Sequence, residues 1–292
     1  MAVTIDLLGR PPRKPDWLRV SLPIGDEYER VRAKVNGLGL HTVCKEAACP
    51  NVAECWGAGT ATIMILGDLC TRGCRFCNVK TGNPRGEIDW LEPLRVAEAV
   101  RDLGWKYLVV TAVDRDDLPD GGALIFANTV RAIHERVPRA RVEILTGDYR
   151  GDLRAVDIVV DAQPDVFAHN LETVRRLTPS VRDKRAGYDQ SLSVLAHVKR
   201  RAPHRYTKTS LMLGLGETAD EIETAMSDAR EAGVDIFTMG QYLQPSRKHL
   251  PVVEFVSPAE FERLGTLAAQ KGFHQVVSSP LSRSSYHAEQ AF

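Results

Sequence analysis

The chain of 292 residues lacks several features that mark specialised classes of protein. Its 38 lysines and arginines balance its 38 aspartates and glutamates, and this zero formal charge argues against a strongly basic nucleic-acid binder. No apolar run approaches the roughly 18 residues of a membrane-spanning helix. The opening stretch, MAVTIDLLGRPPRKPDW, is mixed and polar, so we expect no secretory signal peptide. These absences predict an ordinary soluble enzyme that acts on neither nucleic acid nor membrane.

Cysteine is also scarce, and all six cysteines form two triplets within one short stretch. Cys44, Cys49 and Cys55 have the spacing C-x4-C-x5-C. The second triplet, Cys70, Cys74 and Cys77, has the spacing C-x3-C-x2-C, and no cysteine follows it. Three thiolates are one ligand short of what a 4Fe-4S cluster takes, so each cluster would keep one iron open to a different ligand. The triplets therefore predict two iron-sulfur clusters, in a reducing compartment such as the cytoplasm.

Three other uses of these cysteines are weaker. Disulfide scaffolds are typically short and secreted, whereas a chain of this length buries a core without cross-links. Structural zinc needs four ligands; His41 could complete the first set, but the second has no local fourth ligand. Bacterial ferredoxins use C-x2-C-x2-C-x3-C followed by proline, and neither triplet has that spacing.

From residue 61 onward, short apolar runs alternate with amphipathic stretches. We expect strands at residues 61–69, 106–113, 141–147, 165–170, 205–215, 235–243 and 273–280. Helices are expected at residues 92–104, 123–137, 151–157, 171–177, 189–202, 217–233 and 257–272. This alternation predicts an α/β fold with parallel strands wrapped by helices. Some six units are fewer than the eight of a closed barrel, so we favour an open, partial (β/α)6 barrel over a doubly wound sheet.

Both ends of the chain depart from this alternation. Residues 1–60 are rich in proline, contain one expected helix at 27–38 and carry the first triplet. Residues 281–292 follow the last expected strand. We therefore expect an N-terminal extension over 1–60, a barrel over 61–280 and a C-terminal tail over 281–292.

The second triplet follows the first expected strand, where β/α barrels gather their active sites. Its sequence, DLCTRGCRFCNV, resembles the cysteine loop of the radical S-adenosylmethionine superfamily, with Phe76 as the aromatic residue before the last cysteine. The resemblance implies that these three cysteines bind a 4Fe-4S cluster and that S-adenosyl-L-methionine chelates the fourth iron. It also implies a partial barrel of the radical SAM type and one-electron cleavage of the cofactor to the 5′-deoxyadenosyl radical.

Further segments resemble the lipoyl synthases. They are CKEAACPNVAECW, TAVDRDDLPDGGA, HNLETVRRL, KTSLMLGLGET, GQYLQPSRKHLPV and RSSYHAE, in order from about residue 40. The resemblance implies insertion of two sulfur atoms at carbons 6 and 8 of a protein-bound octanoyl chain. The sulfur would come from an auxiliary 4Fe-4S cluster on Cys44, Cys49 and Cys55. A serine of the RSSY motif would be its fourth ligand, Ser284 by preference and Ser285 as the alternative.

The same resemblance implies partners. They are octanoylated lipoyl domains of 2-oxoacid dehydrogenase complexes or the glycine cleavage H protein, and an electron donor such as ferredoxin or flavodoxin. Nothing in the sequence demands more than a monomer. A basic run, Arg247-Lys248-His249, is compatible with an acidic partner domain or with a solvated loop.

Four residues outside the cysteines are candidates for binding S-adenosyl-L-methionine. Asp114 follows the second expected strand, although its DRDD run could instead be a solvated loop. Asn170 and Glu172 follow the fourth, and Asn170 could instead cap a helix. Arg185 could meet the cofactor's carboxylate through its planar guanidinium, or face solvent among its charged neighbours.

Overall fold

The structure is a computed structural model that describes residues 14–20, 25–286 and 288. Residues 1–13 and 21–24 of the expected N-terminal extension lie outside the described residues. So do residues 287 and 289–292 of the expected C-terminal tail, which include part of the RSSYHAE segment.

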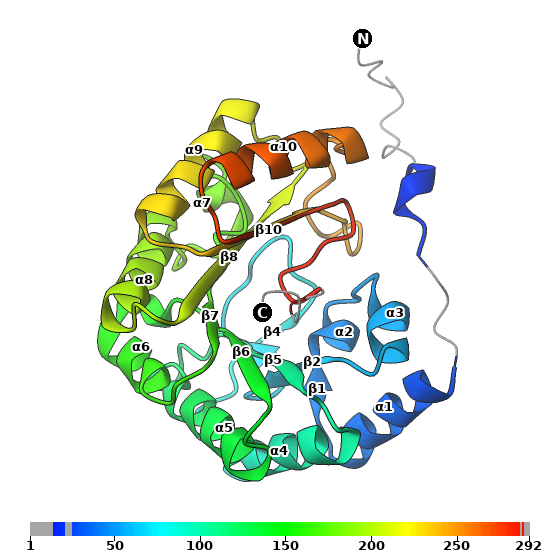
Figure 1. Ribbon diagram of the computed structural model, residues 1–292, viewed down its shortest axis with the longest axis vertical. Helices are drawn as coiled ribbons and strands as arrows, with labels where there is room; N and C mark the ends of the chain where they lie inside the picture. The colour runs from blue at the N-terminus through cyan, green and yellow to red at the C-terminus, as the bar shows by residue number, and fades with distance from the viewer. Residues whose placement is uncertain (1–13, 21–24, 287, 289–292) are drawn as a thin grey trace.

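A curved, eight-stranded sheet forms the inside of the molecule, as Figure 1 shows. Its strand order is β1-β2-β5-β6-β7-β8-β9-β10, so β1 and β10 are its two edges. The parallel strands are β2 (Thr62–Ile65), β5 (Tyr107–Ala112), β6 (Arg141–Leu145), β7 (Val166–Ala168), β8 (Tyr206–Leu213), β9 (Ile236–Gln241) and β10 (Gln275–Ser278). This is the open, partial barrel that the sequence predicts.

Helices cover the outer, convex side of the sheet (Figure 1). They are α4 (Glu92–Leu103), α5 (Ala123–Arg136), α6 (Leu153–Val160), α8 (Tyr188–Arg201), α9 (Ala219–Glu231) and α10 (Pro258–Gln270). Local signals delimit several of them. Gly104 ends α4 in the left-handed conformation with a φ of 68°, and Thr218 and Glu221 form a capping box at the start of α9. Their apolar faces pack on the strands in two large clusters.

The N-terminal extension is more structured than the sequence predicts. It forms α1 (Asp26–Gly37), near the one expected helix, and also α2 (Val43–Glu46), α3 (Val52–Gly57) and the short 3-10 helix η1 (Asp16–Leu18). Between α1 and α2, β1 (His41–Thr42) pairs antiparallel with β2. The expectation of a single helix was wrong because α2 and α3 are too short to show helical periodicity.

Two expected elements inside the barrel also differ. The strand expected at 61–69 ends at Ile65, and Leu66 has a left-handed φ of 67°, so the chain turns before Cys70. Residues 171–177 contain no helix; the short helix α7 (Thr178–Val181) begins only after them. The reason is Glu172, whose φ of 67° is not helical and whose amide donates to the carbonyl of Ser210 on β8 at 3.0 Å.

After β10 the chain turns back into the interior of the ring of helices, in red in Figure 1. The amide of Gln241 on β9 donates to the carbonyl of Pro280 at 3.1 Å. The Asn51 side chain in the N-terminal extension donates to the carbonyl of Leu281 at 2.8 Å. Asn51 of the N-terminal extension and the start of the C-terminal tail are therefore joined to each other and to the barrel. No helix in the described ranges has both the length and the apolar character needed to span a bilayer.

Candidate active site

Two short strands hold the ends of the loop that carries the second triplet. β3 (Leu69–Cys70) pairs in parallel with β4 (Lys80–Thr81). The amide of Thr71 donates to the carbonyl of Asp114 at 2.9 Å, just beyond the end of β5. The loop therefore lies at the carboxyl end of the parallel strands, where the sequence predicts the chemistry.

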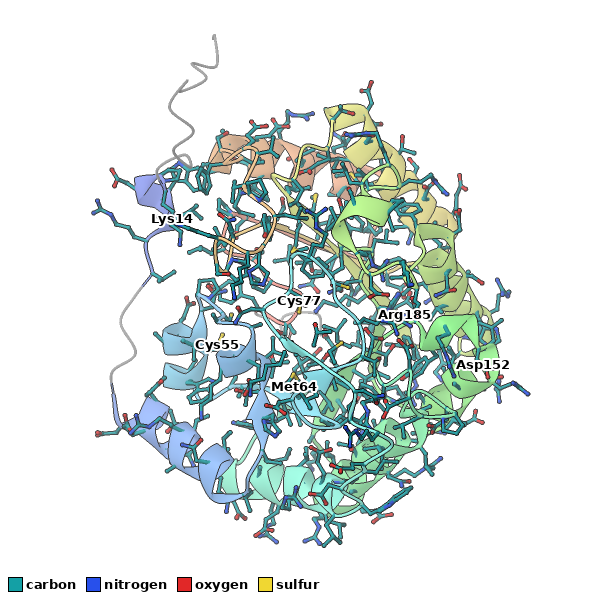
Figure 2. The ribbon with its side chains drawn as sticks, turned by 180° about the vertical axis from the view of Figure 1, so that it is seen from behind. Lys14, Cys55, Met64, Cys77, Asp152 and Arg185 are labelled. Carbon is teal, nitrogen blue, oxygen red and sulfur yellow. The ribbon has the colours of Figure 1, made fainter. Side chains whose placement is uncertain are left out.

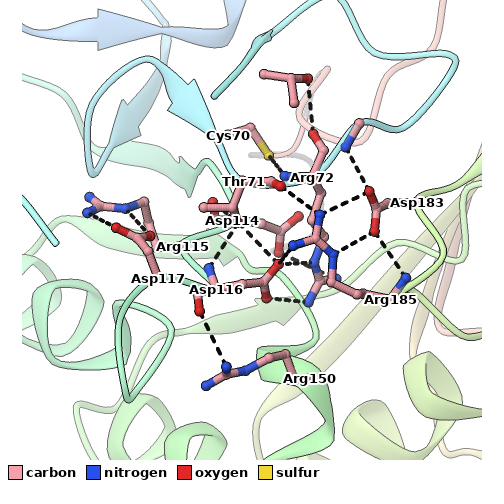
Figure 3. A network of polar contacts seen from close by, with 12 residues as sticks. Cys70, Thr71, Arg72, Asp114, Arg115, Asp116, Asp117, Arg150, Asp183 and Arg185 are labelled. Carbon is pink, nitrogen blue, oxygen red and sulfur yellow. Dashed lines mark hydrogen bonds and ion pairs between the residues drawn. The ribbon is translucent and has the colours of Figure 1, made fainter. Parts of the chain in front are cut away.

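A buried ion-pair network ties this loop to the strands beneath it. The Arg72 side chain is only 2% exposed, and its guanidinium binds both carboxylate oxygens of Asp116 at 2.9 Å, as Figure 3 shows. It also lies 2.7 Å from Asp148, which follows β6. Such a planar fork suits carboxylates that are themselves buried. Arg72 therefore fixes the loop relative to two strands.

The rest of the DRDD run also makes protein contacts. Arg115 binds Asp117 at 2.9 Å and donates to the carbonyls of Leu66 and Glu87 (Figure 3 shows the ion pair). Asp117 in turn accepts from the amide of Gly86 at 2.8 Å. The alternative of a solvated loop is therefore wrong, because Arg115 is buried, the Asp116 side chain is only 11% exposed and Asp117 is bound to the loop before α4.

A cavity of about 290 Å³ lies beside the cysteine loop. Seven predicted site residues are on its wall: Cys70, Cys74, Cys77, Asp114, Asn170, Glu172 and Ser284. The structure therefore brings together residues that are more than 200 positions apart. Val43 of α2 and Ala47, just after that helix, also line it, so the element that carries Cys44 adjoins the cavity of the second triplet.

Of the four residues predicted to bind S-adenosyl-L-methionine, Arg185 alone lies outside this wall. Its guanidinium binds Asp183 at 2.8 Å and Asp116 at 3.2 Å, and it donates to the carbonyl of Thr71 at 2.6 Å (Figure 3). These contacts support the cysteine loop from outside. Arg182 instead lies on the cavity wall, buried and donating to Ser191 at 2.8 Å.

Burial controls the electrostatics of the cavity. It raises the pKa of Cys74 to about 12 and that of Cys77 to about 11, so both thiols are protonated at neutral pH unless a cation binds them. Burial also raises the pKa of Asp114 to about 6, although Arg72 acts in the opposite direction. The pKa of Glu172 is raised by burial as well. A cationic ligand would stabilise the charged form of each of these groups.

Asn170 and Glu172 are held in a strained turn at the cavity wall. Glu172 has a left-handed φ and makes two backbone hydrogen bonds to β8. Its amide donates to the carbonyl of Ser210, and its carbonyl accepts from the amide of Met212 at 2.9 Å. The side-chain amide of Asn170 donates to the Glu172 carboxylate at 3.0 Å. Strain of this kind persists where surrounding contacts impose it, and it is common at ligand sites.

The cavity wall fits an iron-sulfur cluster with a polar organic ligand. Within the described residues, Asn170 Oδ1 and Thr238 Oγ1 are buried without a hydrogen-bond partner, and both residues line the cavity. An unpaired buried polar atom costs about 1–3 kcal/mol, which a ligand with matching groups would recover. Three sulfurs, two carboxylates and these unpaired oxygens are a donor set that suits iron together with an amino-acid group.

The first triplet surrounds the turn between two short helices. Cys44 is on α2, Cys49 follows it and Cys55 is on α3. Burial raises the pKa of Cys44 and of Cys49, and the nearby Arg283 guanidinium opposes this at Cys49. No three His, Cys, Asp or Glu side chains of the described residues are arranged as ligands of a single metal ion.

The two serines of the RSSY motif face different cavities. Ser284 lines the first cavity, whereas Ser285 lines a second cavity of about 280 Å³ together with Cys55. The hydroxyl of Thr62 donates to Ser285 Oγ at 2.8 Å. Of the two serines, only Ser285 thus shares a cavity wall with a cysteine of the first triplet.

Comparison with known proteins identifies the family. Residues 64–229 match the Radical SAM superfamily, and residues 8–49 match the N-terminal domain of lipoyl synthase of that family. A lipoyl synthase of Thermus thermophilus is 58% identical over 96% of this chain and 86% of its own length. One from Anaeromyxobacter sp. is 59% identical over 96% of this chain and 95% of its own length. One from Pyrobaculum arsenaticum is 56% identical over 95% of this chain and 94% of its own length. The chain belongs to the lipoyl synthase family.

Solved structures share the fold of this chain. The hydrogenase maturase HydG superposes with a TM-score of 0.58 at 15% identity, over 74% of this chain and 52% of HydG. Methylornithine synthase (PylB) superposes with a TM-score of 0.56 at 12% identity, over 88% of this chain and 84% of PylB. At such identities the likeness concerns the fold alone. Membership of the superfamily implies a 4Fe-4S cluster and S-adenosyl-L-methionine as cofactors.

Three residues of this candidate site were missed by sequence reasoning. Arg182 lies in the same charged run as Arg185, and nothing local distinguishes the two. Arg283 belongs to the RSSY motif, but its approach to Cys49 depends on how the tail folds back. Asp148 follows the third expected strand, as Asp114 follows the second, and this repeated position could have identified it.

Proposed function

We propose that this enzyme inserts two sulfur atoms at carbons 6 and 8 of an octanoyl chain attached to a lysine of a carrier protein, giving lipoyl-lysine. The main support is that one cavity adjoins both cysteine triplets. The second triplet lines it directly, and Val43 and Ala47 line it from the helix and turn around Cys44. A reaction that needs two clusters at one substrate requires such an arrangement.

In this proposal Cys70, Cys74 and Cys77 bind the first 4Fe-4S cluster. Asp114, Asn170 and Glu172 bind S-adenosyl-L-methionine, and their unpaired or desolvated polar groups support this. When bound, these cofactors supply the one-electron chemistry that removes hydrogen from unactivated methylene groups. Arg185 then acts as a positioning residue, because its contacts support the loop.

The remaining cysteines, Cys44, Cys49 and Cys55, would hold an auxiliary 4Fe-4S cluster that is consumed as the sulfur source. The fourth ligand is a serine of the tail. The cavity shared by Ser285 and Cys55 supports Ser285, and Ser284 is the alternative. Arg283 adds to the fit, because a partly buried guanidinium beside Cys49 favours a negatively charged centre there.

The protein's own contribution is to orient the acyl chain and exclude water. Met64, Val113, Leu145, Leu211 and Met212 provide an apolar wall for the cavity. An octanoyl chain gains free energy when it is buried against such a wall. These five side chains offer water no hydrogen-bond partner, which helps to exclude water from the reacting groups. The strands that carry these residues hold the geometry rigid.

The proposed substrates are octanoylated lipoyl domains of 2-oxoacid dehydrogenase complexes or the glycine cleavage H protein. The electron donor is a ferredoxin or flavodoxin, and the enzyme acts as a monomer in the cytoplasm.

The test uses anaerobically reconstituted protein with dithionite, S-adenosyl-L-methionine and an octanoyl-lysine peptide. We expect 5′-deoxyadenosine and a peptide whose mass has increased by two sulfur atoms less the hydrogens lost. Formation of 5′-deoxyadenosine without sulfur insertion would point to a different substrate. Its complete absence would favour an electron carrier and contradict the proposal.

A further inference from the structure

Four exposed cations gather around the loop of the second triplet: Arg75, Lys184, Arg247 and Lys248, called here the basic face. None of them forms an ion pair with another described residue. This contrasts with Lys80 and Arg185 nearby, which bind Asp68 and Asp183. Cations that remain unpaired together attract an acidic partner, because their fields add.

The basic face comes from three segments that contact one another through the cysteine loop. The amide of Arg75 donates to the carbonyl of Val181 at 2.9 Å, at the end of α7. The amide of Leu250 donates to the carbonyl of Arg75 at 3.3 Å. His249 Nε2 lies 3.1 Å from the carbonyl oxygen of Cys77. The loop after β9 therefore holds Arg247 and Lys248 beside the cysteine backbone.

The face lies on the outer side of the loop that holds the second triplet. Figure 2 shows Cys77 near the middle of the molecule, with this loop in front and Arg185 to one side. Arg75 itself stands between Cys74 and Cys77 in the sequence, and its side chain is exposed. The amide of Asp183, next to Lys184, donates to Cys74 Sγ at 3.3 Å. The segments that carry the basic face therefore contact the cysteine loop directly.

We propose that the basic face is the docking surface for an acidic one-electron carrier protein that reduces the cluster on the second triplet. This inference rests on the proposed function, which requires an external reductant. In each transfer the carrier is oxidised by one electron and the cluster is reduced by one electron, and no bond forms or breaks. Complementary charge raises the rate of encounter and fixes the orientation of the partners.

The carrier of the octanoyl chain is a poorer fit for this face, because none of its four cations lines the cavity that the acyl chain must enter. An acyl chain needs an opening into the cavity, whereas an electron needs only a short path through bonded and contacting atoms. The backbone from Cys74 to Cys77 offers that path, since its outer side contacts the loop after β9. The face therefore fits the reductant.

The test compares two triple charge reversals. The first, Lys184→Glu with Arg247→Glu and Lys248→Glu, leaves the residues between the cysteines unchanged. The matched control, Lys106→Glu with Arg136→Glu and Arg139→Glu, reverses three exposed charges near the amino ends of β5 and β6 that also lack ion pairs with described residues. Formation of 5′-deoxyadenosine is measured with reduced flavodoxin and, separately, with dithionite.

We expect the first variant to lose at least tenfold in kcat/KM for flavodoxin and to keep the wild-type rate with dithionite. The loss should shrink as ionic strength rises, because salt screens exposed charges. The control should match the wild type with both reductants. Unchanged kinetics with flavodoxin, or an equal loss with dithionite, would overturn the inference.

A second comparison separates the possible partners. With dithionite as reductant, sulfur insertion is measured on an octanoylated H protein and on an octanoyl-lysine peptide. A loss by the first variant on the H protein alone would assign the face to the substrate carrier and overturn the reductant proposal. If wild-type enzyme inserts no sulfur into either substrate, the proposed function fails, whereas the flavodoxin comparison still reports on docking.

Discussion

One buried ion pair lies in the barrel next to the cavity wall. Lys208 Nζ on β8 lies 2.9 Å from a carboxylate oxygen of Glu143 on β6, and the two side chains are 3% and 1% exposed. The Tyr107 hydroxyl donates to the same carboxylate at 2.6 Å. Side chains two residues apart share a face of a strand, so the pair forms the layer next to the cavity residues Leu145 and Ser210.

Replacing Lys208 by methionine removes one charge and leaves the Glu143 carboxylate buried with Tyr107 as its remaining partner. Breaking a buried pair in this way lowers the free energy of unfolding by about 3–5 kcal/mol. Unfolding entropy is about 2.1 cal/mol/K per residue, or roughly 0.6 kcal/mol/K for 292 residues. We therefore predict that Lys208→Met lowers Tm by about 5–8 °C.

The assay is a thermal melt of anaerobic protein, with equal iron content and scan rate for every variant. Adding Glu143→Gln to Lys208→Met removes the unpaired charge and should recover at least half of the lost Tm. The control is Lys271→Met, which breaks the more exposed pair with Glu223 and should lower Tm by less than about 2 °C. A Lys208→Met protein that melts with the wild type, or a double variant that melts below it, would refute the reasoning.

Three further predictions concern the site. Alanine at all three positions of the first triplet should remove half of the iron and sulfide while cleavage of S-adenosyl-L-methionine continues; loss of cleavage would contradict separate clusters. In Gly240→Ala the new Cβ overlaps the backbone carbonyl of Ser282, so the tail must move. The ratio of lipoyl product to 5′-deoxyadenosine should fall, and an unchanged ratio would count against a tail ligand. In Gly147→Ala the new Cβ overlaps Asp114 Oδ1, which should raise KM for S-adenosyl-L-methionine about tenfold, a loss of about 1.4 kcal/mol. Gly37→Ala, which meets open space on α1, is the control and should leave KM unchanged.

Local patterns predicted most of the barrel because they act within a few residues. The apolar run at 106–113 became β5, and Gly104 ended the helix before it as its left-handed φ requires. The position of the second triplet after a strand was enough to place its loop at the carboxyl end of the parallel strands. In each case the physical cause lies in neighbouring residues or in the regular β-α alternation.

Two of the failures originate in long-range contacts. Residues 171–177 read as a helix, but hydrogen bonds from β8 impose a left-handed conformation on Glu172. β1 is only two residues long and exists through its pairing with β2. Such contacts leave no periodic trace in the sequence.

The cysteine spacings, the strand-helix alternation and the family motifs were determined by the sequence itself, because chemistry and periodicity are properties of residue type and order. Tertiary structure alone decided that Arg182 rather than Arg185 reaches the cavity, and that Ser284 and Ser285 face different cavities. The two arginines lie in the same charged run and the two serines in the same motif, so the local sequence is the same for both members of each pair. Only the direction in which the folded backbone points each side chain distinguishes them.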